Sequence, residues 1–289
     1  MTAPLLVVDG PFLLYRSFFA LPESIVGLED RPVGALLGAT NLLLRIAADR
    51  APRAIVICFG AEAADYRVAL YAPYHAARPP VPPALAWQLE QAAGFFAAFG
   101  WGSATDPALE ADDLLGSLAR IETRADGRTL ILTGDRDMYQ CVGERVGMLY
   151  LKMGARGVEE VDPAEVERRY GIPPALVPDF IALRGDPSDG LPGAPGIGPK
   201  TAADLLLRHG SLEAAIAGAG GERPRVGAAL TDSAPRLRAF REIATLRMVE
   251  LERPPDRATR IREGAGAARA YGIRRLAERL GRTATLADL

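Results

Sequence analysis

Three short runs of apolar residues divide the first half of the chain. They are Leu5–Asp9, Ala54–Phe59 and Thr129–Thr133, and each is continuously apolar, as expected for a strand that is buried on both faces. Between them, apolar residues recur at helical spacing over 32–49, 84–99 and 110–123. Strands that alternate with helices predict an α/β domain with a central, mostly parallel sheet flanked by helices.

From residue 158 onward the pattern is mostly helical. The predicted helices are 163–170, 174–183, 200–208, 211–217, 235–249 and 266–280, and most are bounded by proline, glycine or a capping residue. We therefore divide the chain into an α/β core over residues 1–170 and a helical region over residues 171–289.

Composition excludes a disordered, secreted or membrane protein. Hydrophobic residues make up 49% of the 289 positions, which is enough to build a sizeable core. Cys58 and Cys141 have neither disulfide nor metal-site spacing. The N-terminus lacks a signal-peptide pattern, and no apolar run reaches membrane length. We expect a cytoplasmic protein without membrane contact, and a monomer because no strong interface pattern is present.

Charge is distributed unevenly along the chain. The formal net charge is −2, but residues 1–221 carry 19 basic and 27 acidic side chains, whereas residues 222–289 carry 15 and 9. The excess acid therefore lies in the first part. Much of it is clustered in short motifs.

Acidic residues follow two of the predicted strands, where a parallel sheet binds its ligands. Asp9 ends the first strand, and Asp135 and Asp137 lie just beyond the third. Further acids begin a predicted helix or occupy a turn, and the complete set is Asp9, Glu110, Asp112, Asp113, Asp135, Asp137, Asp186 and Asp189. Taken singly, an acid at the start of a helix is more often a helix cap or a charge that complements the helix dipole than a catalytic group.

Together, these eight carboxylates predict a cation site. Crowded carboxylates repel one another unless they take up protons or bind cations. Oxygen ligands favour Mg²⁺ or Mn²⁺, and the sequence offers no Cys/His set for zinc. Two such ions about 3.5 to 4 Å apart catalyse in-line displacement at phosphorus without a histidine base.

The stretch ALRGDPSDGLPGAPGIGPKTAA, residues 182–203, joins two of the acids to a Gly-Ile-Gly turn. Pro199 then opens a helix whose free N–H groups attract an anion such as a phosphate. A plain Gly/Pro loop between helices is the alternative. Residues 66–83 interleave aromatic and basic side chains, which suits stacking on bases and binding of phosphates, but equally suits a surface loop or short helix.

The chain resembles the 5′ nuclease family, which includes the 5′-to-3′ exonuclease domain of bacterial DNA polymerase I and the flap endonucleases. The resemblance is carried by VVDGPFLLYRSFFAL, LEADDLLGSLA, TGDRDMYQ and RGDPSDGLPGAPGIGPKTA, which stand in the family's order and spacing. It implies a PIN-like 5′ nuclease fold with a helical arch at about residues 66–83 and a helix-hairpin-helix. No polymerase region follows, so the chain resembles a free-standing member.

The resemblance also implies roles for individual residues. The eight acids match metal ligands for two or more Mg²⁺ or Mn²⁺ ions, and K⁺ is implied at the helix-hairpin-helix. The implied catalytic residues are Asp9, Asp113, Asp135, Asp186, Arg16 and Arg67. The implied DNA-binding residues are Arg67, Tyr74, His75, Arg78, Gly196, Ile197, Gly198, Lys200 and Thr201. The implied substrate is DNA with 5′ flaps, nicks or 5′ ends.

Two positions depart from the family pattern. Gly60 stands where the family has an aspartate, and Glu62 is a candidate substitute because it would face the same way in a continued strand. His75 stands where a lysine is usual. Two alternatives to a DNA nuclease therefore remain open: a DNA junction-binding protein that does not cleave, and a related metal-dependent ribonuclease.

Overall fold

A six-stranded sheet forms the centre of the molecule. The computed structural model describes residues 3–152, 157–283, 285 and 286. The strand order is β3-β2-β1-β4-β5-β6. The strands are β1 (Leu5–Asp9), β2 (Ala54–Gly60), β3 (Gly102–Asp106), β4 (Thr129–Thr133), β5 (Val146–Tyr150) and β6 (Glu159–Val161). All neighbours are parallel except β5 and β6, which confirms the predicted mostly parallel sheet.

The predicted strands are the three central ones, and the prediction missed the outer three. β3 lies at the sheet edge and its residues alternate between exposed and half-buried, so it lacks a continuous apolar run. β6 has only three residues, two of them glutamates. An edge strand has one unpaired side and needs less apolar surface, which weakens its signal in the sequence.

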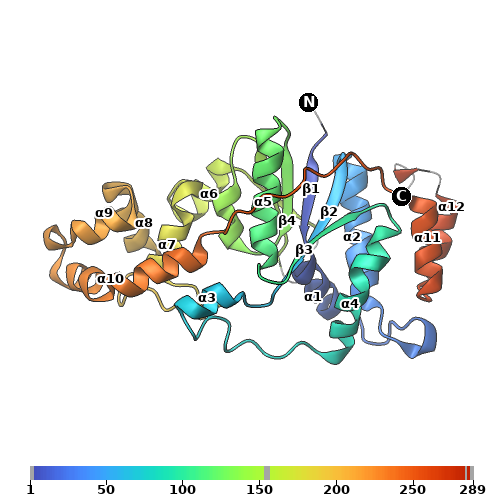
Figure 1. Cartoon of the computed structure of the whole chain (residues 1–289), viewed down its shortest axis with the longest axis horizontal. Coiled ribbons are helices and arrows are strands. Elements are labelled where there is room, and N and C mark those ends of the chain that lie inside the picture. The colour runs from blue at the N-terminus through green and yellow to red at the C-terminus, as the bar shows by residue number, and fades with distance from the viewer. Residues whose placement is uncertain (1–2, 153–156, 284, 287–289) are drawn as a thin grey trace.

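Helices cover both faces of the sheet (Figure 1). Leu6 and Val8 of β1 pack with α1 (Gly10–Ala20), α2 (Gly34–Arg50) and α4 (Pro83–Ala97). Leu5 and Val7 point to the opposite face and pack with α5 (Ala111–Arg124). This alternation is the normal period of a strand buried between two helical layers.

The helical region extends the core on the α5 side. After α6 (Pro163–Tyr170), which ends the core region, it contains η3 (Pro174–Leu176), α7 (Val177–Arg184), α8 (Pro199–His209), α9 (Leu212–Ala217), η4 (Ala219–Gly221) and α10 (Pro224–Ala244). Their buried faces join one apolar cluster with α5 and the sheet. α10 begins eleven residues before the predicted start at Pro235, which instead lies inside the helix.

The last two helices return to the α/β core, so the predicted grouping of residues 171–289 differs from the structure. Residues 245–260 cross α5 as extended chain and lead to α11 (Ile261–Ala270) and α12 (Arg274–Arg282) (Figure 1). Ile261 and Leu280 pack with the helices on the opposite side of the sheet from α10. The single helix predicted over 266–280 is interrupted at Gly272, whose φ of 74° a helix does not accommodate.

Buried ion pairs attach the crossing segment to the core. Glu122 of α5 is 1% exposed and binds both Arg53 and Arg253. Its pKa is lowered by the hydrogen bonds from these two guanidinium groups, which outweigh the effect of burial. Within the residues that the structure describes, none of the helices is long and apolar enough to cross a membrane.

Candidate active site

Six of the eight predicted acids line one cavity of about 560 Å³ at the carboxyl edge of the sheet. They are Asp9, Glu110, Asp112, Asp135, Asp137 and Asp189. Asp9 ends β1, Asp135 and Asp137 follow β4, and Glu110 and Asp112 stand at the start of α5. The predicted convergence of acids from distant parts of the sequence is therefore present in the structure.

Thr133 fixes two of these acids relative to each other. Its hydroxyl donates to Asp9 Oδ2 at 2.7 Å and accepts a hydrogen bond from the backbone N–H of Asp135 at 3.0 Å. Asp9 also caps α1 by accepting from the N–H of Phe12 at 3.0 Å. Thr133 was not among the predicted site residues. Its position at the end of a strand, two residues before an acid, was the available signal.

Loss of hydration and repulsion from neighbouring carboxylates raise the pKa values of several of these acids. Burial, followed by repulsion from Asp189, raises the pKa of Asp135 to about 7. Burial and the charge of Asp135 also raise the pKa values of Asp112 and Asp137 well above the usual range. The cavity therefore favours the uptake of protons or cations by its carboxyl groups.

The donor set fits hard divalent cations. Carboxylate oxygens dominate the polar lining of the cavity, which matches Mg²⁺ or Mn²⁺ better than a metal that prefers sulfur ligands. Among the described residues, however, no three His, Cys, Asp or Glu side chains lie close enough together to hold an ion as they stand. Bound cations would remove the repulsion between such side chains.

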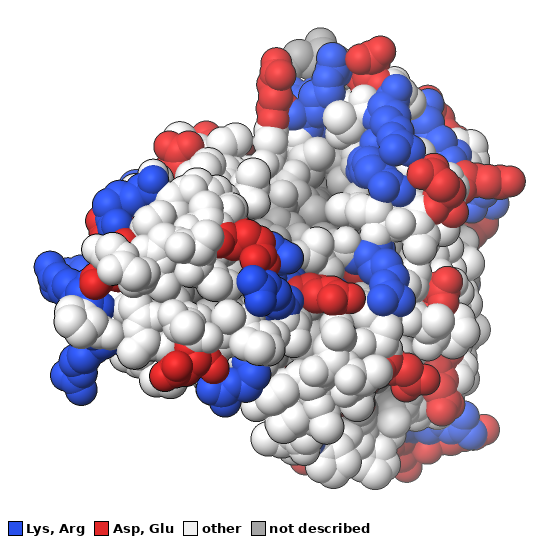
Figure 2. Space-filling view, turned by 60° about the vertical axis from the view of Figure 1, so that its left-hand side comes forward, with Lys and Arg blue, Asp and Glu red and all other residues white. Residues whose placement is uncertain are grey.

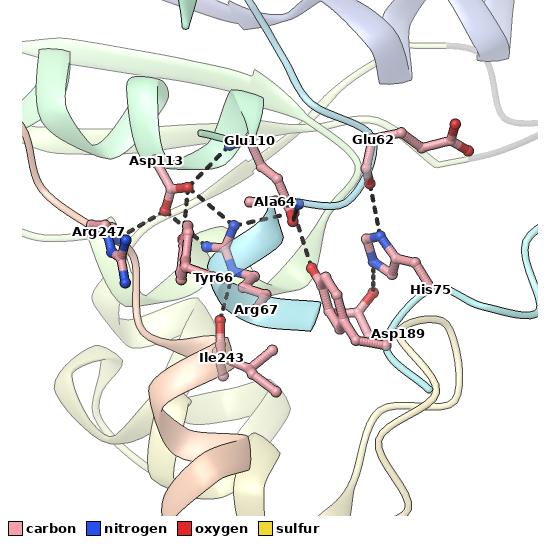
Figure 3. A network of polar contacts seen from close by, with 12 residues as sticks. Glu62, Ala64, Tyr66, Arg67, His75, Glu110, Asp113, Asp189, Ile243 and Arg247 are labelled. Carbon is pink, nitrogen blue, oxygen red and sulfur yellow. Dashed lines mark hydrogen bonds and ion pairs between the residues drawn. The ribbon is translucent and has the colours of Figure 1, made fainter. Parts of the chain in front are cut away.

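Asp113 does not line the cavity, so the prediction that it is a metal ligand is wrong. Its side chain is fully buried in a bidentate pair with Arg67, with N···O distances of 2.8 and 3.0 Å (Figure 3). Its oxygens also accept hydrogen bonds from the Tyr66 hydroxyl and from the Arg247 N–H. Because neighbouring positions on a helix point about 100° apart, Asp112 reaches the cavity and Asp113 turns to the core.

Arg67 likewise differs from the predicted phosphate-binding role. Its side chain is 3% exposed and pairs with Glu110 at 3.2 Å as well as with Asp113. Its Nε donates to the carbonyl of Ile243 at 2.9 Å. These contacts engage the guanidinium on all sides and make Arg67 a positioning residue for Glu110.

Asp186 is largely buried and is not among the residues that line the cavity. It accepts hydrogen bonds from Ser188 N at 2.9 Å and from Arg184 at 3.1 Å. Its charge still contributes to the raised pKa values of Asp135 and Asp137, so it lies within electrostatic reach of the cavity. Of the acid pair in the turn, Asp189 is the one that lines the cavity.

The predicted helical arch has a different form. Only α3 (Asp65–Leu70) is an α-helix, and the chain then runs without regular structure to α4 (Figure 1). The intervening residues include Pro73, Pro79, Pro80 and Pro82. Proline lacks an N–H donor and clashes with the preceding helical turn, which explains why a longer helix does not form here.

The arch segment is joined to the acids by internal contacts. Tyr74 is 5% exposed, stacks on His75 and donates to Glu110 Oε2 at 2.9 Å. His75 Nδ1 donates to the carbonyl of Glu62 at 2.8 Å, and its Nε2 lies 3.0 Å from Asp189 Oδ1 (Figure 3). Arg78 also contacts Asp189, at 3.2 Å. Tyr74 and His75 are thus occupied within the protein, while the Arg78 side chain is 38% exposed.

The other predicted DNA contacts lie outside the cavity. Arg16 on α1 donates to the carbonyl of Lys152 at 3.3 Å. Gly196, Gly198 and Lys200 are exposed where the loop enters α8, and Thr201 is half-buried in its first turn. Ile197 is 3% exposed and anchors this loop in the core, so it does not present its side chain to a ligand.

Gly60 has a steric role at the end of β2. A Cβ atom there would lie 2.4 Å from the Leu109 carbonyl oxygen and 2.6 Å from the Glu110 carbonyl carbon. The glycine allows β2 to approach the start of α5. Glu62 lines the cavity, but its carboxylate points away from the buried network (Figure 3), and its role as a substitute acid stays a prediction.

We expect Asp113→Asn and Asp112→Asn to change the free energy of unfolding in opposite directions. Asp113→Asn breaks a buried ion pair and leaves Arg67 uncompensated, which should lower the free energy of unfolding by about 3 to 5 kcal/mol. Asp112→Asn removes repulsion and should stabilise the metal-free protein at pH 7. Urea unfolding with EDTA measures both, and equal destabilisation by the two variants would contradict the assignment.

The cavity also predicts how stability depends on pH. The pKa of Asp135 is about 7 in the folded protein, whereas its ordinary pKa is 3.8. Between these two pH values the folded state therefore binds more protons than the unfolded state. The free energy of unfolding of the metal-free protein should therefore fall as pH rises from about 4 to about 7. Asp135→Asn should flatten this slope. A steeper fall in the variant, measured by urea unfolding at each pH, would refute the prediction.

Restoring the missing acid should damage the fold. We expect Gly60→Asp and Gly60→Ala each to lower the free energy of unfolding by about 1 to 3 kcal/mol, because the added Cβ overlaps the α5 backbone. Gly102→Ala is the matched control in the same sheet, since its nearest contact would be at 3.7 Å. Unfolding midpoints of Gly60→Ala and Gly102→Ala that shift equally would rule out this steric role.

Comparison with known proteins places the chain in a family. Residues 4–171 match the family described as "5'-3' exonuclease, N-terminal resolvase-like domain", and residues 172–263 match "5'-3' exonuclease, C-terminal SAM fold". A 5'-3' exonuclease of Mycobacterium tuberculosis is 38% identical, with 76% of this chain and 74% of that protein covered. DNA polymerase I of Mycobacterium bovis is 36% identical over 87% of this chain, which spans only 28% of that longer relative.

Solved structures share the fold at low sequence identity. A T5 5'-exonuclease with divalent metal ions (zinc) bound has a TM-score of 0.68 at 16% identity and covers 96% of each chain. The catalytic core of Rad2 in complex with a DNA substrate has a TM-score of 0.62 at 14% identity, with 93% of this chain and 87% of that chain covered. These two structures show the shared fold. The family matches over residues 4–263 and the relative that is 38% identical show that the chain belongs to the 5'-3' exonuclease family.

Proposed function

We propose that this protein is a structure-specific 5′ nuclease that hydrolyses DNA phosphodiesters at 5′ flaps, nicks or 5′ ends. The observation that carries the proposal is the cavity of six carboxylates. So much uncompensated negative charge would repel a phosphate backbone unless cations were bound, which is the requirement of metal-dependent phosphodiester hydrolysis. Family membership supports the same activity.

The ligand set that we propose is Asp9, Glu110, Asp112, Asp135, Asp137 and Asp189. Mg²⁺ or Mn²⁺ held there would supply an activated water and charge stabilisation at the phosphate. Thr133 orients Asp9 and Asp135, and the Tyr74 hydroxyl and Arg67 orient Glu110. Three carboxylates are therefore held by neighbouring side chains before any substrate binds.

Arg78 is the best candidate for a phosphate contact at the cavity. It is partly exposed and lies against Asp189, and His75 contacts the same carboxylate oxygen. When Asp189 is neutralised by a cation, its hold on both side chains weakens. Arg78 is then available to a phosphate, for which its planar guanidinium is well suited.

We further propose that α7, residues 185–198 and α8 form a helix-hairpin-helix that grips the backbone of duplex DNA. Exposed Gly196 and Gly198 allow close approach of a phosphate to the start of α8, where Pro199 occupies the first turn. Lys200 adds a positive charge, and K⁺ is the candidate ion for this turn. The proposed DNA-bound form is a monomer.

The test is cleavage of a 5′-flap DNA duplex with Mg²⁺ or Mn²⁺. Asp135→Asn removes a charge from the cavity and should reduce kcat at least about 100-fold, as expected for loss of a group that acts at the reacting phosphate. Asp162→Asn is the matched control, because Asp162 caps α6 through a similar hydrogen bond but lies outside the cavity lining. It should cleave normally.

The same assay separates the alternative functions. Tight flap binding without cleavage under either metal would favour the junction-binding protein. Preferential cleavage of a matching RNA flap would favour the ribonuclease. Metal-dependent cutting near the DNA junction that is lost in Asp135→Asn and retained in Asp162→Asn would support the proposed nuclease.

A further inference from the structure

Gln140 is the last residue of the TGDRDMYQ motif, and none of the roles proposed above involves it. It lies in the short helix η2 (Arg136–Cys141), which follows β4. Its side-chain Nε2 donates to the carbonyls of Asp137 at 2.9 Å and of Ala244 at 2.8 Å. Its Oε1 accepts a hydrogen bond from the N–H of Leu246 at 3.2 Å. These contacts use both N–H groups and the carbonyl of the side-chain amide.

The three hydrogen bonds join two parts of the cavity wall that are far apart in the sequence. Asp137 lines the cavity after β4, and Ala244 and Leu246 line it where α10 ends. Ala244 is the last residue of α10, and the last carbonyl groups of a helix have no partner within it. Gln140 supplies a donor to one of them. The end of α10 is therefore fastened to the turn that carries the acids after β4.

The buried pair of Arg67 and Asp113 holds the same segment from outside. Arg67 Nε donates to the Ile243 carbonyl at 2.9 Å, and Asp113 Oδ1 accepts from the Arg247 N–H at 2.8 Å. The contacts are nested, because the ion pair binds the outer two backbone groups and Gln140 binds the two between them. The chain at the end of α10 is therefore held both to α3 and α5 and to the turn after β4.

The contact between Gln140 and Asp137 extends to a second carboxylate. The N–H of Asp137 donates to Asp135 Oδ1 at 2.8 Å, and the N–H of Asp135 donates to the Thr133 hydroxyl at 3.0 Å. A series of hydrogen bonds thus runs from the end of α10 through Gln140 to both acids that follow β4. A shift of the Gln140 side chain would reach the carboxylates through this series.

Gln140 makes these contacts without carrying a charge. On the face that Figure 2 shows, basic and acidic side chains mostly lie next to one another, so charged groups supply many of the polar contacts there. Beside the cavity, an arginine would offset part of the negative charge that is proposed to hold cations, and a further acid would increase the repulsion. An amide supplies two donors and an acceptor and leaves the charge of the cavity unchanged.

We propose that Gln140 is a positioning residue for the metal site. By fastening the turn after β4 to the end of α10, it holds Asp135 and Asp137 in the arrangement that binds divalent cations. This inference rests on the proposed function, in which both aspartates are metal ligands. Loss of a partner that orients metal ligands typically lowers metal affinity by about 10- to 100-fold. Gln140 contacts neither the cation nor the DNA in this proposal, so its loss should weaken metal binding and leave the grip on DNA intact.

The test compares Gln140→Met with Gln88→Met. Methionine is similar to glutamine in length and is unbranched, but it lacks the amide that forms these bonds. Gln88 is the matched control, because its amide also makes three hydrogen bonds to backbone groups. It accepts from the N–H groups of Ala35 and Leu36 and donates to the carbonyl of Ala84. Gln88 is buried and is not among the residues that line the cavity.

Two measurements use the protein without DNA. In EDTA, hydrogen exchange of the Asp137 and Leu246 N–H groups should be about 10-fold faster in Gln140→Met than in the wild type, because the two segments are no longer held together. With Mn²⁺ as the only divalent ion, the Kd for Mn²⁺ should rise by about 10-fold or more. Gln88→Met should leave both quantities close to their wild-type values.

Cleavage of a 5′-flap DNA duplex supplies a third measurement. At a Mn²⁺ concentration near the wild-type Kd, Gln140→Met should lower kcat by at least about 5-fold, as expected from an affinity that is about 10-fold weaker. KM for the DNA should be unchanged, because the proposed hairpin contacts are far from Gln140. Additional Mn²⁺ should restore much of the lost kcat. A general loss of stability would not respond to Mn²⁺ in this way.

The inference would be overturned by a folded Gln140→Met protein that binds Mn²⁺ as tightly as the wild type, or by equal weakening in Gln88→Met. If the urea unfolding midpoint shows that Gln140→Met does not fold, Gln140→Asn takes its place. Its amide is one methylene shorter and should also raise the Kd for Mn²⁺, and an unchanged Kd would again overturn the inference.

Failure of the proposed function gives a different result. A wild-type protein that neither binds Mn²⁺ nor cuts the flap would overturn the nuclease proposal, and this inference with it. A wild-type protein that binds Mn²⁺ and cuts, beside a Gln140→Met protein that does both equally well, would overturn the role of Gln140 alone.

Discussion

Repulsion among the carboxylates at the sheet edge is the constraint to which the rest of the structure is fitted. Parallel strands place Asp9 and the residues after β4 at the same edge, and α5 adds Glu110 and Asp112. Such a concentration of charge opposes folding unless protons or cations reduce it. The pKa of Asp135 is raised first by burial and then by repulsion from Asp189, so it reflects both costs. The cavity is thus built for ligands that carry positive charge, and the protein holds it together by contacts outside the cavity.

The pair of Arg67 and Asp113 is central to those outer contacts. Arg67 belongs to α3, Asp113 to α5, and the backbone partners Ile243 and Arg247 lie at the end of α10 and in the crossing segment (Figure 3). One buried ion pair therefore links the arch, the helix that carries two cavity acids, and the chain that leads to α11. The pair also reaches Glu110 directly, so a contact that stabilises the fold helps to orient the site.

The extent to which the sequence predicted this molecule differs between its parts. Central strands are continuously apolar and were predicted correctly, whereas β3 is an edge strand that needs less apolar surface. The strand-end acids Asp9 and Asp135 were placed at one edge because topology requires it. The sequence did not show which of Asp112 and Asp113 faces the cavity. Which of two adjacent helical acids faces a cavity depends on how the helix packs, and that depends on Arg67, far away in the sequence.

Composition was a poor guide to exposure in the arch. Tyr74 and His75 suggested a surface that waits for nucleic acid, yet both are occupied by Glu110, Glu62 and Asp189. The reason is that buried acids need donors, and an aromatic or basic segment nearby supplies them before any substrate does. The residue type at position 60 is likewise set by local packing, because the close approach of the α5 backbone leaves no room for a Cβ atom there.

The separation of charge explains how a protein of net charge −2 can serve a polyanionic substrate. Acid is concentrated within the cavity, where bound cations would offset it. Basic side chains are in excess only in residues 222–289, where 15 stand against 9 acidic ones. At physiological ionic strength charges farther apart than about 8 Å are largely screened from one another. A DNA substrate therefore responds to the charge of the surface that it contacts. The net charge of the protein alone does not decide whether DNA binds.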